Sequence, residues 1–193
     1  RQVGAFSADH RVIVPERSGH GRSRDIPGPF TYQKMMEQTE GVLDALAIED
    51  ANVLGWSDGG VIGLLLAIHR PRRVARLCVV GAGFDVAGNS AEFMERVRVM
   101  TSETYPGPAR ELYAGLSPDG ADHWPVVFEK TKRLWLNEPR IPAEDLETIA
   151  CPTLIVRGDR DDVIQPAHLE AMHRHIGGSG LSVLPWSGHD VLL

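Results

Sequence analysis

Residues 51–59 have the sequence Ala-Asn-Val-Leu-Gly-Trp-Ser-Asp-Gly, in which a short apolar run leads directly into a G-x-S-x-G motif. Residues 51–56 are typical of a buried strand, and the apolar run over 58–69 predicts a helix. Ser57 therefore lies on a tight turn between a strand and a helix. This strand, turn and helix form the context in which G-x-S-x-G presents a nucleophilic serine.

The geometry of this turn explains the residues around the serine. Side chains two positions from Ser57 would collide in so tight a turn, so we expect Gly55 and Gly59 to be glycine for steric reasons. The turn raises the hydroxyl above the sheet, and the following helix directs free N–H groups at an oxyanion that forms beside it. The backbone N–H of Asp58 is the expected oxyanion donor.

A base and an acid for this serine occur later in the chain. A serine hydroxyl is a poor nucleophile at neutral pH and needs an adjacent base, which an acid holds in one tautomer. Three acids, Asp159, Asp161 and Asp162, follow one predicted strand, and His189 follows the next. The carboxyl ends of parallel strands meet at one edge of a sheet. We therefore expect the acid and the histidine to lie close to Ser57. The order along the chain, serine first, then aspartate, then histidine, agrees with such a group of three catalytic residues.

The remaining pattern alternates strands with helices, which implies a parallel sheet with helices packed on it. Thr31 is a candidate N-cap for the first amphipathic helix, whose apolar residues recur every three or four positions. The further predicted strands are 10–15, 74–80, 152–156 and 181–184, and the further predicted helices are 32–46 and 166–175.

Residues 84–149 interrupt this alternation with a helical, aromatic-rich insertion. We expect residues 1–83 and 150–193 to form the core and residues 84–149 to form a lid over the strand ends, with Trp124, Phe128 and Trp135 lining the substrate pocket together with Trp56. The alternative is that these aromatic side chains are ordinary helix-packing core. The helices predicted within the insertion are 91–100, 109–116 and 123–136.

Taken together, these motifs resemble the α/β-hydrolase family over nearly the whole chain, and the loop at residues 15–23 (Pro-Glu-Arg-Ser-Gly-His-Gly-Arg-Ser) is similar to the family's loop after its fourth strand. The resemblance implies the α/β-hydrolase fold, with a mostly parallel sheet covered by helices. The family's acid ends a Gly-x-x-Asp stretch, which falls on Asp161. Asp159 and Asp162 are then turn-capping or solvated neighbours.

Two further stretches, residues 54–60 and 174–185, resemble the valacyclovir hydrolase group within this family. That resemblance implies cleavage of α-amino-acid esters, with Asp58 holding the substrate ammonium. The alternative is that Asp58 simply complements the dipole of the helix that it begins, a contribution of roughly 0.3–1 kcal/mol.

The resemblance also implies an incomplete chain. The family's first three strands, its second oxyanion donor and its closing helix have no counterpart in residues 1–193. Because the third strand of the family lies beside the nucleophile strand, we expect an unpaired gap along residues 51–56.

Composition excludes several other functions. Lys and Arg number 20 against 26 Asp and Glu, giving a net charge of −6 and no basic face for nucleic acid. No apolar stretch approaches the roughly 20 residues of a membrane span. Cys78 and Cys151 are expected to be free and buried, and a cytoplasmic location is the default. The sequence does not specify the oligomeric state.

No cofactor or metal is expected. Residues 81–86 have valine where a dinucleotide fingerprint requires glycine or alanine, and His173 and His175 lie two apart on a helix, facing different directions. We therefore expect a serine hydrolase that cleaves small-molecule carboxylic esters through an acyl-enzyme. The alternatives are cleavage of amide, lactone or carbon–carbon bonds on the same fold, or a non-catalytic ligand-binding protein.

Overall fold

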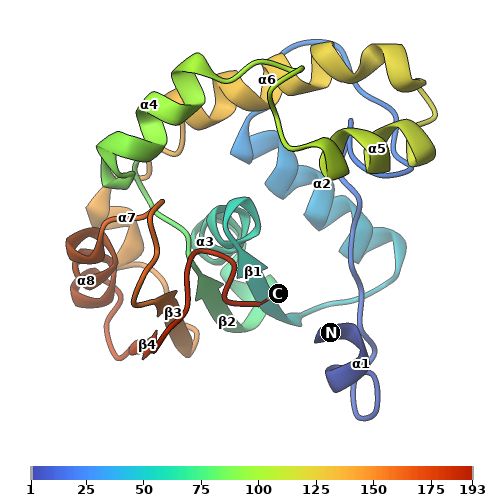
Figure 1. The fold of residues 1–193 in the computed structure, drawn as a ribbon. Coiled ribbons are helices and arrows are strands. Elements are labelled where there is room, and N and C mark those ends of the chain that lie inside the picture. Colours follow the sequence, from blue (N-terminus) through green and yellow to red (C-terminus); the bar gives the residue numbers. More distant parts are fainter. Residues whose placement is uncertain (1, 193) are drawn as a thin grey trace.

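The computed structural model describes residues 2–192. At its centre lies a parallel sheet of four strands in the spatial order β1-β2-β3-β4 (Figure 1). Spatial order follows chain order, so each crossover returns the chain to the next position. Because all neighbouring pairs are parallel, the four carboxyl ends lie at the same end of the sheet. The strands are β1 (Ala51–Trp56), β2 (Val74–Val80), β3 (Thr153–Gly158) and β4 (Gly180–Leu184), which confirms those predicted from residue 51 onward.

The helices also follow the predicted pattern. The hydroxyl of Thr31 accepts a hydrogen bond from the Lys34 N–H at 3.2 Å, so Thr31 is the N-cap of the first long helix. The helices are α1 (Gln2–Phe6), α2 (Tyr32–Ala45), α3 (Asp58–His69), α4 (Ala91–Val99), α5 (Gly107–Leu116), α6 (Trp124–Asn137), α7 (Ala143–Leu146) and α8 (Pro166–His175), with 3₁₀ turns at Pro71–Arg73, Val86–Gly88 and Ala121–His123.

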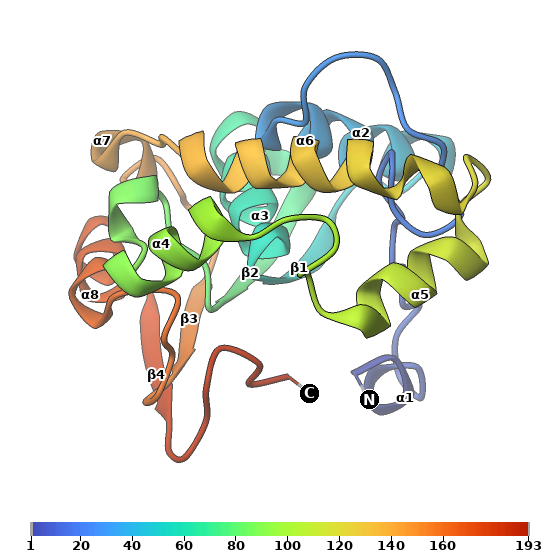
Figure 2. The same cartoon turned by 45° about the horizontal axis from the view of Figure 1, so that its top comes forward.

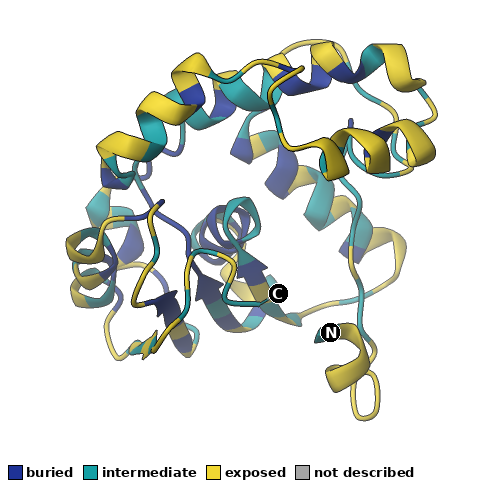
Figure 3. Cartoon of the chain, in the orientation of Figure 1, coloured by how far each residue is buried: buried dark blue, intermediate teal, exposed yellow. Residues whose placement is uncertain are grey.

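Helix α3 is the centre of the core. It packs against β1 and β2 on one side and against α2 on the other, so it is apolar around most of its circumference. Its Leu64 and Leu66 are fully buried, and each contributes roughly 1.5–3 kcal/mol by leaving water. Figure 3 shows this buried centre in dark blue. The helix that follows the serine is therefore held rigidly against the sheet.

The other face and the β1 edge of the sheet are more open. On the face away from α3, Leu54 and Leu154 are 44% and 43% exposed. The strand predicted at residues 10–15 is absent, because residues 11–17 have no regular structure, and that prediction is wrong. A cavity of about 750 Å³ separates Val12 and Val14 from β1. Without an adjacent strand to receive its N–H and C=O groups, this β-branched run has no ladder to join.

Helices α4, α5 and α6 form an arch beside the sheet (Figures 1 and 2). The chain enters and leaves this arch through two paired segments. The Ile141 N–H donates to the Phe84 carbonyl at 2.8 Å, and the Val86 N–H donates to the Pro139 carbonyl at 2.7 Å. These bonds fix the base of the arch.

Two further expectations concern membrane spans and the state of the cysteines. Within residues 2–192, no helix has both the length and the apolar character that a membrane crossing requires. Cys78 and Cys151 are free and half-buried. The cytoplasmic location stays a prediction from sequence.

Of the two glycines of the G-x-S-x-G motif, only Gly55 lies where a side chain would collide. Ser57 has φ 52° and ψ −120°. A Cβ on Gly55 would lie 2.1 Å from the Gly59 carbonyl oxygen, as expected, whereas a Cβ on Gly59 would meet nothing within 4 Å. The steric role expected for Gly59 is therefore wrong, because its α-hydrogens face open space. The second essential glycine is Gly60, where a Cβ would lie 2.5 Å from that of Ala82.

This asymmetry gives a matched pair of substitutions. Gly55→Ala forces the backbone of α3 away from β1, so we expect a loss of roughly 3 kcal/mol in the free energy of unfolding and a lower Tm. Gly59→Ala lies in a helix with room for a methyl group, and should be neutral or stabilising by about 0.5–1 kcal/mol. Urea unfolding followed by circular dichroism measures both changes. An equal loss in the two variants would contradict this description of the turn.

Candidate active site

Three side chains from three strand ends lie in one hydrogen-bonded line. Ser57 follows β1, Asp161 follows β3 and His189 follows β4. Nε2 of His189 lies 3.1 Å from Oγ of Ser57, and Nδ1 lies 3.1 and 3.2 Å from the two carboxylate oxygens of Asp161. With a proton on Nδ1 donated to the carboxylate, Nε2 is left to accept the serine proton.

The Asp161 side chain is inaccessible to solvent, although the residue as a whole is partly exposed through its backbone. Burial alone would raise the pKa of its carboxyl, but the hydrogen bond from His189 and those from the N–H groups of Ile164 and Val163 outweigh burial and lower the pKa below its ordinary value. The carboxylate is therefore ionised at neutral pH and fixed in orientation by the backbone.

The two neighbouring acids lie elsewhere. Asp159 accepts a hydrogen bond from the N–H of Ser187 at 3.1 Å, which anchors the loop that carries the histidine. Asp162 forms an exposed ion pair with Arg96 at 2.8 Å. Of the three candidate acids, the structure brings Asp161 to the histidine ring.

Glycines allow the acid and histidine loops to approach each other. A Cβ on Gly158 would lie 2.1 Å from the carbonyl oxygen of Ser187 and 2.3 Å from that of Gly188, which explains the glycine of the Gly-x-x-Asp stretch. Gly81, at φ 54°, lies directly beside the imidazole, where a Cβ would be 3.3 Å from Nδ1 of His189. Nothing in the local sequence around Gly81 predicts this position beside the imidazole.

Trp56 also holds the histidine loop. Its Nε1–H donates to the carbonyl oxygen of His189 at 2.9 Å, and the two rings lie 5.7 Å apart. The side chain expected only to contact substrate therefore also links the strand before the serine to the loop that carries the base.

A cavity of about 440 Å³ opens onto the serine and the histidine. Trp56 and Trp135 line it, as expected, and Asp58 does so as well. Tyr105, an aromatic residue of the 84–149 insertion, lines it too. The lining side chains that were not expected include Arg17, Tyr32 and Glu138, because nothing in their local sequence points to this cavity.

Trp124 and Phe128 lie in a different place from the one expected. They line a second cavity of about 300 Å³, which is walled mainly by aromatic and aliphatic side chains of α5 and α6. The two cavities adjoin, because Asp58, Tyr105 and Trp135 line both. Trp124 and Phe128 are also almost fully buried, so they pack the arch as well as line this second space.

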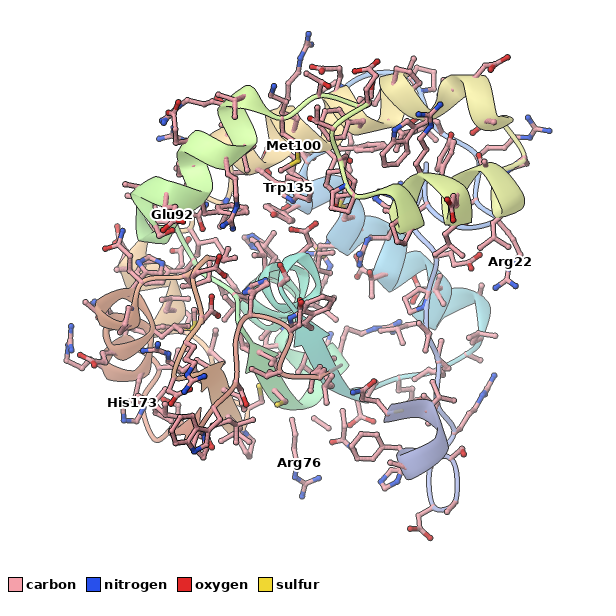
Figure 4. The ribbon with its side chains drawn as sticks, viewed as in Figure 1. Arg22, Arg76, Glu92, Met100, Trp135 and His173 are labelled. Carbon is pink, nitrogen blue, oxygen red and sulfur yellow. The ribbon has the colours of Figure 1, made fainter. Side chains whose placement is uncertain are left out.

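The Asp58 carboxylate is held by two neutral donors. The Tyr32 hydroxyl donates to Oδ1 at 2.7 Å, and Nε1–H of Trp135 lies 3.1 and 3.2 Å from the two oxygens. Burial, and then the negative charge of Asp58, raise the pKa of Tyr32 well above its ordinary value, so this hydroxyl stays protonated. Figure 4 shows Trp135 on the side of α6 that faces the sheet.

The backbone N–H of Asp58 is available for an oxyanion. It lies at the first residue of α3, where no intrahelical acceptor exists, and no other residue in the range 2–192 accepts from it. No group of three or more His, Cys, Asp or Glu side chains among these residues is placed to hold a metal ion.

Comparison with known sequences gives one family. The model described as "Alpha/beta hydrolase family" matches residues 2–193. Serine hydrolase BPHL of Homo sapiens is 28% identical over 192 residues, covering 93% of this chain and 62% of that protein. Putative carbamate hydrolase RutD of Azorhizobium caulinodans is 30% identical, covering 97% of this chain and 77% of that protein. This chain thus spans less than two thirds of the length of the BPHL relative.

Solved structures give the same fold. The meta-cleavage product hydrolase CumD from Pseudomonas fluorescens IP01 superposes with a TM-score of 0.74 at 24% identity, covering 97% of this chain and 75% of that one. A thermophilic esterase from Thermogutta terrifontis superposes with a TM-score of 0.68 at 28% identity, covering 97% of this chain and 76% of that one.

Proposed function

The chain belongs to the alpha/beta hydrolase family, and we propose that it is a serine hydrolase that cleaves carboxylic esters through an acyl-enzyme. The observation that supports this most directly is the hydrogen-bonded line from Ser57 through His189 to Asp161, at the floor of a cavity large enough for a small ester. The reaction class of the relatives, which are named hydrolases, agrees with it.

The proposed reaction has two halves. Oγ of Ser57 attacks the ester carbonyl while Nε2 of His189 takes its proton, and the oxyanion accepts a hydrogen bond from the Asp58 N–H. The intermediate collapses, and His189 returns the proton to the departing alcohol. Water then attacks the acyl-enzyme, with the same base accepting and returning one proton, which releases the acid and regenerates the serine. Asp161 stabilises the imidazolium throughout and is not itself protonated.

An ester needs less activation than an amide or a carbon–carbon bond, because an alcohol is a better leaving group than an amine or a carbanion. His189 lies next to Ser57, where it can protonate that alcohol. A non-catalytic binding role is disfavoured because the buried Asp161 and its backbone hydrogen bonds are arranged to orient an imidazole rather than to contact a ligand.

We assign the role of a lid to residues 84–149. Trp135 of α6 bonds to the residue that directly follows the nucleophile, and Tyr105 lines both cavities. The arch would thus exclude water from the reacting carbonyl, and the second cavity would take an apolar part of the substrate.

The choice of acid is tested by three single substitutions. Asp161→Asn keeps the shape of the side chain but allows the wrong imidazole tautomer, so kcat for p-nitrophenyl acetate should fall roughly 10⁴-fold without loss of folding. Asp162→Asn, one position along and on the surface, is the matched control and should leave kcat within about twofold. If Asp159→Asn lowers kcat more than Asp161→Asn does, the acid is misassigned.

Within this activity, Asp58 is suited to recognise a substrate ammonium. A carboxylate has about four acceptor positions, and Tyr32 and Trp135 do not use all of them. Both donors are neutral, and no ion pair among residues 2–192 includes Asp58, so its charge is not compensated. An ammonium within about 4 Å would gain roughly 1 kcal/mol in water-like surroundings and about 4 in a partly buried site.

The preference for an amine is measured by comparing free and N-acetylated α-amino-acid esters. That gain corresponds to a ratio of about fivefold to nearly a thousandfold in kcat/KM, and Asp58→Asn should remove most of it. The Asn variant keeps the backbone N–H, so its kcat/KM for p-nitrophenyl acetate should fall much less than its ratio of kcat/KM for free over acetylated esters. Equal rates for free and acetylated esters in the wild-type protein would contradict the ammonium role. Asp58 would then be only a helix-end acid that holds Tyr32 and Trp135.

A further inference from the structure

Arg17 is the one Lys or Arg side chain among the described residues that line the catalytic cavity. Its Nε atom is buried and has no hydrogen-bond partner in residues 2–192. No carboxylate in that range lies within ion-pair distance of its guanidinium. Burying part of a charged group without a partner is unfavourable, so this position calls for an anion that the described residues do not supply.

Two of the acids near Arg17, Glu16 and Glu138, accept hydrogen bonds from other groups. Glu16, the sequence neighbour of Arg17, accepts three hydrogen bonds from Arg22, two of them from the guanidinium at 2.8 and 3.0 Å. Glu138, which lines the same cavity, accepts from the backbone N–H of Tyr32 at 2.9 Å. Glu16 is therefore paired with the solvent-exposed Arg22, and Arg17 lines the cavity without an ion-pair partner in residues 2–192.

The loop that carries Arg17 is held firmly. The Ser18 N–H donates to Oε1 of Gln38 at 3.2 Å, and Nε2 of Gln38 donates to the Ser18 hydroxyl at 2.9 Å, which ties the loop to α2. Further along the same loop, the buried Asp25 carboxylate accepts from Lys130 of α6 at 2.6 Å. A guanidinium on a fixed backbone is preorganised for a ligand.

Arg17 and His189 reach the cavity from different parts of the fold. The segment that leads to Arg17 lies beyond β1, at the edge of the sheet (Figure 1). His189 adjoins Gly81, which follows β2, and Asp161, which follows β3. An alcohol that takes its proton from His189 would leave on the His189 side, and an acyl chain directed away from it would lie on the side of Arg17.

We propose that Arg17 binds a carboxylate at the far end of the substrate's acyl chain, so that the enzyme accepts monoesters of short dicarboxylic acids. The planar guanidinium can bind both oxygens of such a carboxylate. A cavity of about 440 Å³ holds an acyl chain of this size. The inference rests on the proposed ester hydrolysis by Ser57, and it is compatible with amine recognition at Asp58, because an amino dicarboxylic acid carries both groups.

A matched pair of esters tests the inference. p-Nitrophenyl hemiglutarate and p-nitrophenyl valerate have acyl chains of equal length and differ in the terminal carboxylate. Arg17→Gln should lower the hemiglutarate-to-valerate ratio of kcat/KM about 10- to 100-fold, chiefly through KM, and Arg17→Lys should retain part of the ratio. Arg24→Gln is the control and should leave the ratio unchanged, since Arg24 lies in the same loop with its side chain 73% exposed and does not line the catalytic cavity.

The outcomes separate this inference from the proposed function. Loss of valerate hydrolysis in every protein, wild type included, would mean that the ester-hydrolase proposal fails. Normal valerate hydrolysis with an unchanged ratio in Arg17→Gln would overturn the role of Arg17 alone. Binding of monomethyl glutarate to the Ser57→Ala protein, measured by calorimetry, gives a readout without turnover, and it should weaken at least tenfold when Arg17→Gln is added. Equal binding with and without Arg17→Gln would also overturn the role.

Discussion

The backbone of Ser57 has φ 52° and ψ −120°, a strained conformation for a residue with a side chain, and the close approach of β1 and α3 holds it there. That approach depends on the missing side chain of Gly55, which brings its backbone against Gly59, and on the fit of Gly60 against Ala82. The burial of α3 between the sheet and α2 supplies the stabilisation that offsets the strain. The hydroxyl position, the free N–H of Asp58 and the cavity above them all follow from this turn.

The loops that carry Asp161 and His189 also depend on the close approach of backbone segments. Gly158 lets the histidine loop lie directly against the end of β3, and Gly81 leaves room for the imidazole. Asp159 and Trp56 then fix that loop by hydrogen bonds to its backbone. The Ser57, His189 and Asp161 side chains are thus brought into line mainly by backbone contacts, with little freedom left to the side chains themselves.

Sequence patterns predicted well the features that are encoded locally. The strands from residue 51 onward, helix α3 and the helices of the arch follow from apolar periodicity and from Pro and Gly positions. The strand predicted at residues 10–15 failed because strand formation needs a partner, which local sequence does not show. Trp124 and Phe128 were expected in the catalytic cavity but line its neighbour, because an aromatic residue in a helix has the same signature in either place. Tyr32 and Arg17 could not be predicted, since the hydrogen bond to Asp58 and the missing ion pair arise from tertiary contacts.

The cavity combines charges of both signs that the described residues do not pair with each other. Asp58 is held by neutral donors, and Arg17 is separated from its neighbouring acid by the bond between Glu16 and Arg22. Such an arrangement costs stability in the free protein and is offset when a ligand supplies the opposite charges. Recognition in this protein would then depend on the placement of these charges around the proposed ester-cleaving centre.

The most direct test of that centre is the site of covalent labelling by a fluorophosphonate, mapped by peptide mass spectrometry on the full-length protein. This reagent reacts with serines that a neighbouring base activates. The arrangement described here predicts phosphonylation of Ser57, loss of labelling in Ser57→Ala and near loss in His189→Ala. Labelling of a different serine, or undiminished labelling in Ser57→Ala, would contradict the assignment of the nucleophile.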